Sequence, residues 1–346
     1  MFVFEITDPN DGLREVLGSL VENGITQSSR NGPVLRFPRP VCLQYNHPQR
    51  RLLTSPIRDA NPFFHLFETM WMFAGRAEIQ PLLVYNPGMA QYSDDGSKLR
   101  GTAYGERWRN YPGWGDQILK ATDALRGNPD DRRVVLSMWD PRELGETGKD
   151  FACNLQVIFN TRPNPDSSQP LLDMTVTNRS NDLIYGAMGS NLFHFSMLLE
   201  YVALHSNLAV GTYYQVSSNL HLYTENKVAA RCLEQRELIG NSVSLAGRKD
   251  TSLTDLSLTV DSKPIASYVR DRDFPTEEPY IQQVVAPLVE AYHIFKMKSR
   301  LGINMDPQVR ISAAQDVAGA CVSEPLRAAC QDWLERRRPA PAEKAQ

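Results

Sequence analysis

Hydrophobic and polar positions follow two periods along this chain, one typical of β-strands and one typical of α-helices. Period-two alternation or a short continuous apolar run predicts strands at residues 33–43, 134–139, 151–159, 173–176 and 212–216. Apolar residues at helical spacing predict helices at residues 63–74, 115–126, 191–205, 227–240, 281–297 and 312–337. The mixture predicts an α/β (α+β) fold, in which a large mixed sheet packs against the long helices 63–74 and 191–205.

Residues at the ends of these segments support the predicted boundaries. Residues 30–32 read Arg-Asn-Gly, which suits the turn of a hairpin leading into the sheet. Asn61, followed by proline, predicts the start of the first long helix, and Gly75 predicts its end. Ser190 or Asn191 can cap the helix that follows, which we expect to be buried on one face.

Polar side chains interrupt the strand pattern where a strand would normally continue to bury side chains. Residues 178–182 read Asn-Arg-Ser-Asn-Asp directly after an apolar alternation, and polar groups at the end of a strand usually mark a site. Farther along, His221 and Tyr223 are two positions apart, so a strand places both rings on the same side. We therefore expect these groups and Asn191 to surround one pocket.

Composition restricts the possible functions. The chain has 346 residues, of which 42% are hydrophobic, so it can bury a sizeable core. It has no apolar run of about 20 residues and no signal-peptide pattern, which predicts a cytoplasmic protein without a membrane partner. A formal net charge of −3 offers no general attraction to nucleic acid, so an anionic substrate must be held by local arginines.

Three residue types with possible chemistry each have a structural alternative. The five cysteines lack CxxC spacing, which argues against a disulfide framework or a metal site; they are Cys42, Cys153, Cys232, Cys321 and Cys330. Cys153 lies in a strand context, where a lone cysteine is most often a small core residue rather than a nucleophile. Glu68 lies among aromatic residues of a helix, either at the edge of a solvated face or in a pocket for proton transfer. For His221, a satisfied strand histidine would ordinarily be the safer interpretation.

The order of these residues resembles the nucleotide-binding core of the thymidylate synthase superfamily. The pattern is Arg179-Ser180-x-Asp182-x-x-x-Gly186, then Asn191 at the start of a long helix, then His221-x-Tyr223. The upstream anchors are Glu68-x-x-Trp71, Tyr104-Gly105-x-x-Trp108-Arg109 with Asp116-Gln117, Asp131-Arg132-Arg133 with Trp139-Asp140, and Cys153. The resemblance extends over residues 30–223 and implies the fold of that superfamily.

The resemblance implies a covalent mechanism with a folate cofactor. Cys153 matches the family's nucleophile, a thiolate that adds to carbon 6 of a pyrimidine and so makes carbon 5 reactive. Arg179 is the residue expected to lower the pKa of this thiol. Glu68 and Tyr104 match groups that relay protons through water. Asp182 matches an aspartate that serves the cofactor, 5,10-methylenetetrahydrofolate.

The resemblance also implies how a nucleoside monophosphate is held. The residues that match the family's phosphate cluster are Arg30, Arg179 and Ser180 of one subunit, with Arg132 and Arg133 of the other subunit of a homodimer. His221 and Tyr223 match the contacts to the sugar hydroxyl. Asn191 matches the residue that reads the base, if one extra residue is allowed after Gly186. Its amide complements uracil, whereas an aspartate at this position would suit cytosine.

Several segments depart from the family's pattern. They are Ala152-Cys153-Asn154 in place of Pro-Cys-His, residues 187–191 in place of Leu-Pro-Phe-Asn, and Ser217-Ser218-Asn219 in place of Gly-Gly-Asp. The loop at 86–92 lacks the tryptophan that shields the reactive methylene, and helices with a polar tail replace the closing C-terminal peptide. A wetter site favours addition of water. We therefore predict a pyrimidine nucleotide 5-hydroxymethyltransferase of the hydroxymethylase branch, acting on dUMP first and dCMP second.

Two other functions fit the same residues. A divergent thymidylate synthase would make dTMP, and a catalytically silent nucleotide-binding relative would use Cys153 only for packing. We predict that residues 1–240 form the catalytic core and that 241–337 form a helical extension packed on it. Residues 241–276 are polar with short β-like runs, and residues 338–346 are low in apolar content, which predicts a disordered tail.

Overall fold

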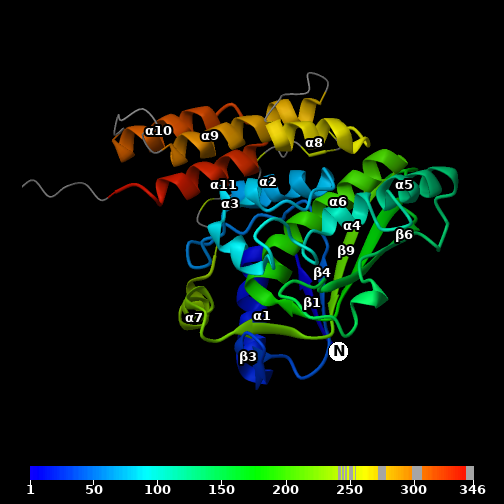
Figure 1. The fold of residues 1–346 in the computed structure, drawn as a ribbon, viewed down its shortest axis with the longest axis horizontal. Coiled ribbons are helices and arrows are strands. Elements are labelled where there is room, and N and C mark those ends of the chain that lie inside the picture. The colour runs from blue at the N-terminus through cyan, green and yellow to red at the C-terminus, as the bar shows by residue number, and fades with distance from the viewer. Residues whose placement is uncertain are drawn as a thin grey trace, which may run out of the picture.

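Helices stacked in layers on one face of a mixed sheet make up the molecule (Figure 1). The computed structural model describes residues 1–240, 243, 245, 248, 252–253, 255–271, 278–297 and 306–339. Within these ranges, every helix is too short or too polar to cross a membrane.

The larger sheet has six strands. In order across the sheet they are β1 (Phe2–Ile6), β4 (Val41–Tyr45), β9 (Ala209–Ser217), β7 (Leu171–Asn178), β6 (Asn154–Arg162) and β5 (Val135–Ser137). β1 pairs with β4, and β7 with β9, in the parallel sense, while the other neighbours are antiparallel. The predicted strands at 134–139, 151–159, 173–176 and 212–216 all contribute to it, which confirms the expected mixed sheet.

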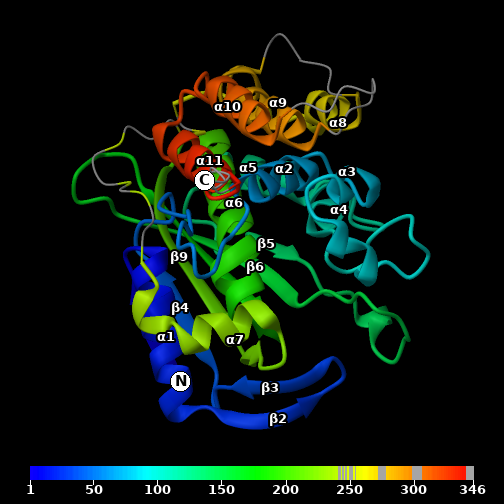
Figure 2. The ribbon, with the colours of Figure 1, turned by 90° about the vertical axis from the view of Figure 1, so that its left-hand side faces the viewer.

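A smaller sheet of four strands brings several candidate site residues together. Its order is β2 (Ile25–Ser29), β3 (Gly32–Arg36), β10 (Leu220–Tyr223) and β8 (Asn181–Asp182). β2 and β3 form the predicted hairpin, which projects from the body in Figure 2. Gly32 follows the turn with a φ of +109°, which suits glycine. β10 lies between β3 and β8, so His221 is paired with Arg36 on one side and with Asp182 on the other.

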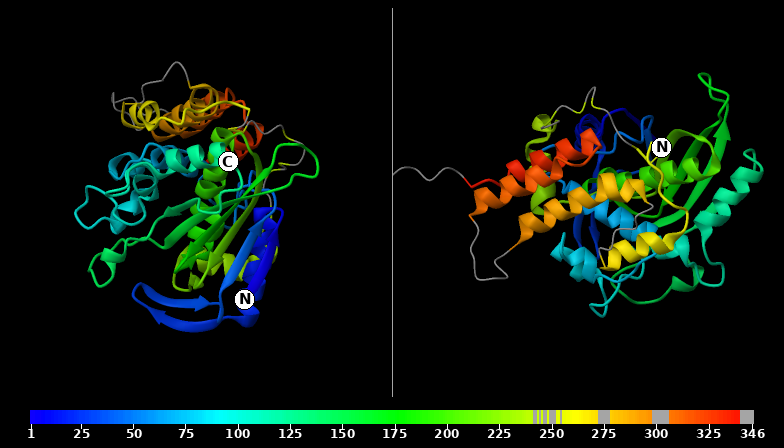
Figure 3. Two further views of the ribbon diagram at one scale, coloured as in Figure 1. Left: turned by 90° about the vertical axis from the view of Figure 1, so that its right-hand side faces the viewer. Right: turned by 90° about the horizontal axis from the view of Figure 1, so that it is seen from above.

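The helices form successive layers above the larger sheet. Those of the first 240 residues are α1 (Pro9–Asn23), α2 (Pro62–Phe73), α3 (Gln80–Leu83), η1 (Pro87–Tyr92), α4 (Tyr104–Arg109), α5 (Gln117–Gly127), η2 (Pro141–Glu143), η3 (Leu183–Ser190), α6 (Asn191–Ser206), α7 (Lys227–Glu234) and η4 (Arg236–Leu238). The remaining described ones are α8 (Ser262–Asp271), η5 (Ile281–Val285), α9 (Ala286–Lys296), α10 (Pro307–Ala318) and α11 (Glu324–Glu335). α6 packs on β7 and β9, α2 packs on α6, and α8, α9 and α11 pack on α2. Seen from above in Figure 3, the yellow, orange and red C-terminal helices lie over this centre.

Two predictions about α6 are wrong. The helix is buried on all sides over residues 191–203, because the sheet covers one face and α2 covers the other. Ser190 and Asn191 make no capping hydrogen bond through their side chains, because the helical chain already begins in the π-helical segment η3. Asp182 caps that earlier start by accepting hydrogen bonds of 2.9 and 2.7 Å from the N–H groups of residues 184 and 185.

The C-terminal part is helical where the structure describes it. The β-like expectation is wrong for α8, in which Ile265, Tyr268 and Val269 are buried at helical spacing. The rest of 241–276 falls mostly outside the described residues. The predicted helix 312–337 is two helices, α10 and α11, with a break at 319–323.

Aromatic packing joins the C-terminal helices to α2. The ring of Phe63 lies 5.3 Å from that of Tyr292 in α9 and 5.6 Å from that of Trp333 in α11. The division into a core of 1–240 and an extension of 241–337 stays a prediction. Of the predicted tail, Arg338 donates hydrogen bonds to Glu335, Ser312 and Gln315, and residues 340–346 lie outside the described residues.

The face of the larger sheet opposite α6 is only partly buried in the single subunit. One cross-strand row on this face runs through all six strands and consists of Val135, Ile158, Thr175, Tyr214, Gln44 and Glu5. Each of these side chains is exposed or half-buried. Strands that alternate between buried and half-exposed residues leave one face of a sheet available for another layer.

Candidate active site

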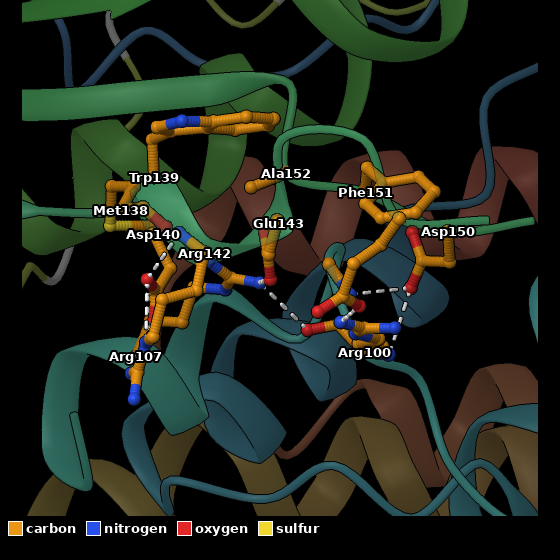
Figure 4. A network of polar contacts seen from close by, with 12 residues as sticks. Arg100, Arg107, Met138, Trp139, Asp140, Arg142, Glu143, Asp150, Phe151 and Ala152 are labelled. Atoms are coloured by element: carbon orange, nitrogen blue, oxygen red, sulfur yellow. Dashed lines mark hydrogen bonds and ion pairs between the residues drawn. The ribbon is translucent and has the colours of Figure 1, made fainter. Parts of the chain in front are cut away.

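Cys153 lies immediately before β6. It ends a short segment that includes Asp150, Phe151 and Ala152, which are labelled in Figure 4. The buried Asp150 carboxylate accepts hydrogen bonds of 2.9–3.1 Å from the backbone N–H groups of residues 100–102. At Gly101 a Cβ atom would lie 2.3 Å from the backbone carbon of Phe151, so only glycine allows the two segments to cross this closely. We call these contacts the Asp150 network.

A buried arginine ties the same region to the end of β5. Arg107 donates hydrogen bonds to the carbonyl oxygen of Met138 and to the Glu143 carboxylate, and a third of 3.2 Å to the carbonyl oxygen of Arg100. The Arg107 and Glu143 side chains are each less than a tenth exposed. A buried charge pair of this kind is expensive to break, so the segment before Cys153 is firmly supported.

Arg179 donates hydrogen bonds to the backbone of Cys153 and of the residue before it. Its N–H donates to the carbonyl oxygen of Cys153 at 2.9 Å, and its Nε donates to that of Ala152 at 2.9 Å. Burial raises the pKa of the Cys153 thiol; the charges of Arg179 and Arg30 act to lower it and that of Asp150 to raise it further. Arg179 thus acts in the predicted direction, but burial outweighs it.

Arg30 reaches the same segment from the tip of the β2–β3 hairpin. Its Nη1 and Nη2 donate to the carbonyl oxygens of Gly148 and Lys149 at 2.9 and 3.0 Å. Two guanidinium groups that are far apart in the sequence therefore converge beside Cys153. Ser180 is half-buried next to Arg179, so three of the five predicted phosphate residues lie at one end of the site.

The other two predicted phosphate residues lie elsewhere. Arg132 and Arg133 are exposed and precede β5. Arg133 pairs with Asp131 at 2.8 Å, and across the described residues neither arginine contacts another candidate site residue. Their contribution to a partner's site stays a prediction.

Tyr104, at the start of α4, is buried next to the nucleophile. Burial raises the pKa of its hydroxyl strongly, and the Cys153 thiol contributes to the rise, while the N–H groups of Asn154 and Cys153 oppose it. The Tyr104 hydroxyl is therefore neutral and close to the nucleophile, as a proton relay requires.

Glu68 is buried rather than at the edge of a solvated face. It is 5% exposed in the middle of α2, and its Oε2 lies 3.0 Å from Nε2 of His194 in α6. Sequence reasoning did not single out His194. Its spacing of three residues from Asn191 would have placed it on the same helical face as the base reader, but nothing in the sequence pairs it with Glu68.

Asn191 belongs to a buried chain of side-chain amides. Its Nδ2 donates to Oδ1 of Asn181 at 3.1 Å, and Nδ2 of Asn181 donates to Oε1 of Gln215 at 2.9 Å and to Ser217 at 3.3 Å. Gln215 in turn donates to the hydroxyl of Tyr213 at 2.6 Å. Oδ1 of Asn191 accepts no hydrogen bond within the described part of the chain, so it is available to a ligand.

His221 and Tyr223 share one side of β10, as predicted, with ring centroids 5.0 Å apart. Asp182 lies beside His221 on the neighbouring strand. Burial raises the pKa of the Asp182 carboxyl and lowers the pKa of His221, and the charge of each opposes the shift of the other. Burial thus favours the uncharged form of both groups.

Two residues near Asp182 were missed by sequence reasoning. Arg58 is 7% exposed, donates from Nε to the carbonyl oxygen of Ile184 at 2.8 Å and lies 4.7 Å from the ring centroid of Tyr185. Tyr92, in η1, is close enough to Asp182 for that charge to raise the pKa of its hydroxyl, after burial as the first cause. The segment around Arg58 shows no local signal of a site, whereas Tyr92 lies in the loop at 86–92, which the sequence assigns to the site without singling out this residue.

Comparison with known proteins identifies the family of the chain. The family model described as thymidylate synthase matches residues 13–271. The chain belongs to the thymidylate synthase family. It is 39% identical to the deoxyuridylate hydroxymethyltransferase of Pseudomonas phage M6, over 98% of this chain and 95% of that protein. It is 31% identical to the protein of the same name from Bacillus phage SP01, over 78% of this chain and 70% of that protein.

The thymidylate synthase fold is also found by structural comparison. The crystal structure of thymidylate synthase from T4 phage matches with a TM-score of 0.52 at 21% identity, covering 67% of this chain and 81% of that chain. The family model ends within α8, and the alignment with the M6 protein extends over nearly the whole chain. Helices α9 to α11 therefore lie beyond the part that defines the thymidylate synthase family.

Proposed function

We propose that this member of the thymidylate synthase family transfers a one-carbon unit to carbon 5 of dUMP and completes the reaction with water, giving 5-hydroxymethyl-dUMP. The observation that carries the proposal is the 39% identity to a deoxyuridylate hydroxymethyltransferase over almost the full length of both chains. The site described above contains a group suited to each step of that reaction.

The orientation of Asn191 supports uracil over cytosine. Because its Nδ2 already donates to Asn181, the amide is fixed with Oδ1 available for the N3–H of uracil and a second N–H available for the oxygen at position 4. Cytosine has an acceptor at N3 and a donor at position 4. In this orientation of Asn191, the acceptor of cytosine would face Oδ1 and its donor would face an N–H, so neither hydrogen bond could form. Competition between dUMP and dCMP for binding tests the assignment, and a clear preference for dCMP would overturn it.

The phosphate is held at the end of the site where Arg30, Arg179 and Ser180 converge. Bidentate guanidinium groups suit a compact dianion. Arg132 and Arg133 of a second subunit complete this cluster, and His221 and Tyr223 bind the sugar hydroxyl; these roles rest on the family pattern and on the exposure of the two arginines.

The half-exposed face of the six-stranded sheet supports a homodimer. Its cross-strand row includes Val135, Ile158 and Tyr214, which a second copy of the sheet would cover. Sedimentation at micromolar concentration is expected to show a dimer. A fully active monomer would contradict both the dimer and the shared phosphate site.

Cys153 is the nucleophile in this proposal. Its thiolate adds to carbon 6 and turns the ring into an enolate, so that carbon 5 can attack the one-carbon unit. The positive charges of Arg179 and Arg30 favour the thiolate. Both arginines also bind the dianionic phosphate, which places them together next to Cys153. Tyr104 and Glu68 then remove the hydrogen of carbon 5. The electron pair of that C–H bond forms the exocyclic double bond as the bond from the one-carbon unit to the cofactor breaks, so tetrahydrofolate leaves.

The residues around Asp182 fit a folate. Oδ1 of Asp182 accepts the N–H groups of residues 184 and 185, while Oδ2 makes no hydrogen bond with the described residues and can accept from the pterin ring. The guanidinium of Arg58 offers donors beside it. When bound, 5,10-methylenetetrahydrofolate supplies the one-carbon unit.

Water rather than hydride is the second reactant because the aromatic cover over the site is polar and incomplete. Tyr92 lies by Asp182 and Tyr223, but it is 41% exposed and carries a hydroxyl. Hydride delivery requires water to be excluded. Incubation with dUMP and methylenetetrahydrofolate is expected to give 5-hydroxymethyl-dUMP without dihydrofolate absorbance.

One observation favours a divergent thymidylate synthase as second candidate, namely that Tyr92 does place an aromatic ring near the site. In that case dihydrofolate and dTMP form in equal amounts. A silent nucleotide-binding relative would instead bind dUMP but trap no 5-fluoro-dUMP through Cys153. The same incubation therefore separates all three functions.

A further inference from the structure

A polar contact between α2 and α6 joins Glu68 and His194. Their Oε2 and Nε2 atoms are 3.0 Å apart, and the side chains are 7% and 1% exposed. His194 follows Asn191 by three residues in α6, so both point from the same face of that helix. The pair is therefore next to the residue that reads the base.

Neither side chain is satisfied by the protein. Across the described residues, Oε2 of Glu68 and both ring nitrogens of His194 lack a well-directed hydrogen bond, although the two groups are within ion-pair distance. Buried polar atoms in native proteins are nearly always bonded to protein or to an ordered water. Three such atoms together, in a site whose reaction consumes water, indicate a place for a water molecule.

Two other basic side chains in this region, His65 and Arg58, form no hydrogen bond or ion pair with Glu68 among the described residues. His65, one turn before Glu68 in α2, is buried with its ring 5.8 Å from that of Phe193, and burial followed by the charges of Arg58 and His194 lowers its pKa well below the usual value. His65 is therefore neutral. Arg58 is directed to the carbonyl oxygen of Ile184 instead. His194 is the group that can hold Glu68 in place.

We propose that His194 is a positioning residue, which holds the Glu68 carboxylate and with it seats the water that attacks the exocyclic methylene. This inference rests on the proposed function, since a hydroxymethyl product requires that water. Once the carboxylate or the ring turns so that the Nε2–H of His194 is directed at Oε2, 3.0 Å away, the other oxygen, Oε1, is left to accept from water and take its proton.

The chemical step conserves atoms and electrons without a redox partner. The water oxygen forms a bond to the methylene carbon, and a proton of the water passes to Glu68. The electron pair of the exocyclic double bond moves into the ring as an enolate. The enolate then re-forms the carbonyl at carbon 4 and the double bond between carbons 5 and 6 by expelling the Cys153 thiolate.

Three substitutions at one position test the role of His194. His194→Gln places an amide N–H near the position of Nε2, whereas His194→Asn places it near Nδ1, and His194→Phe has no donor. We expect His194→Phe to lower kcat for 5-hydroxymethyl-dUMP by about a hundredfold, with KM for dUMP nearly unchanged. His194→Gln should recover a large part of the lost kcat, and His194→Asn should not.

Two further measurements separate this role from a structural one. All three variants should still form the covalent adduct with 5-fluoro-dUMP, because Cys153 and the phosphate residues are intact. The neighbouring His65→Gln, which removes a buried histidine that forms no hydrogen bond or ion pair with Glu68 among the described residues, should keep kcat near the wild-type value. Wild-type kcat in His194→Phe, or equal kcat in the Gln and Asn variants, would overturn the proposal.

The products of the wild-type enzyme distinguish a failure of the proposed function from a failure of the role proposed for His194. If it forms the 5-fluoro-dUMP adduct but yields dTMP and dihydrofolate, the proposed function fails and so does the role of His194 in seating water. If it yields 5-hydroxymethyl-dUMP while the His194 variants match it, only the inference about His194 fails.

Discussion

The two ends of the candidate site are built in opposite ways. Near Cys153, the Asp150 carboxylate accepts hydrogen bonds from the backbone N–H groups of residues 100–102, and Arg179 donates a hydrogen bond to the backbone next to the thiol. Around Glu68 and His194, buried polar atoms lack directed partners. The backbone that carries the nucleophile is held by hydrogen bonds within the protein, although the Asn154 side chain next to it lacks a partner among the described residues. Among the same residues, both titratable groups at the proton-handling end lack directed partners.

The difference has a physical reason. A nucleophile must be placed to within a fraction of an ångström before substrate arrives, and hydrogen bonds to a rigid backbone achieve this. Groups that exchange protons with water must keep lone pairs free, which costs stability in the empty site. Substitutions at the first end should therefore reduce stability, and those at the second should reduce only turnover.

The largest effect is expected from Cys153→Ala. Without the thiolate, carbon 5 is not activated, so turnover should fall by at least about 10⁴-fold and the 5-fluoro-dUMP adduct should disappear from denaturing mass spectra. Cys232→Ala, which removes another thiol near Arg58, should retain the adduct. Equal turnover in wild type and Cys153→Ala would leave only a nucleotide-binding protein.

Glu68→Gln should separate activity from stability. Loss of the base is expected to lower kcat by about 10²- to 10³-fold, while Tm stays equal or rises, because a buried carboxylate without a directed hydrogen bond becomes a neutral amide. Glu106→Gln changes a half-buried carboxylate in α4 and serves as control. A marked decrease in the Tm of Glu68→Gln would show that the two ends are built alike.

Asp150→Asn should, in contrast, lower stability as well as activity. The amide cannot accept all the N–H groups that the carboxylate accepts, so we expect a loss of about 2–4 kcal/mol in stability, seen as a lower Tm, and slower turnover. Because the charge of Asp150 raises the pKa of Cys153, the thiol pKa should fall. Iodoacetamide should then alkylate Cys153 faster at pH 8 while catalysis is slower, and slower alkylation would contradict this account.

Arg179→Gln should give the smallest effect on structure and a clear effect on titration. Arg179 lowers the pKa of Cys153, so its removal raises that pKa, and the alkylation rate should reach half its maximum at higher pH than in wild type. Arg30→Gln should shift the midpoint in the same direction but less, since its charge contributes less. A shift to lower pH in either variant would exclude the arginines as thiolate-stabilising groups.

Much of the fold could be predicted because local rules determine it. The hairpin turn at 30–32, the start of α2 at Asn61 and the alternation of β7 each follow from a few neighbouring residues. Stretches without a strong local preference were predicted less well. The sequence of α8 has short β-like runs, but the segment is helical, with Ile265 and Tyr268 buried at helical spacing.

By itself, the sequence determined which residues could do chemistry and in what order they occur. The polar cluster at 178–182, the pair His221 and Tyr223, and the lone Cys153 were visible because strand periodicity is local. Only the tertiary structure decided that Glu68 faces His194 and that Asn191 is oriented by Asn181. The first contact joins two separate helices, and the second joins residues on either side of the irregular segment η3. Both depend on how the helices are layered on the sheet, and local spacing along the sequence does not encode that layering.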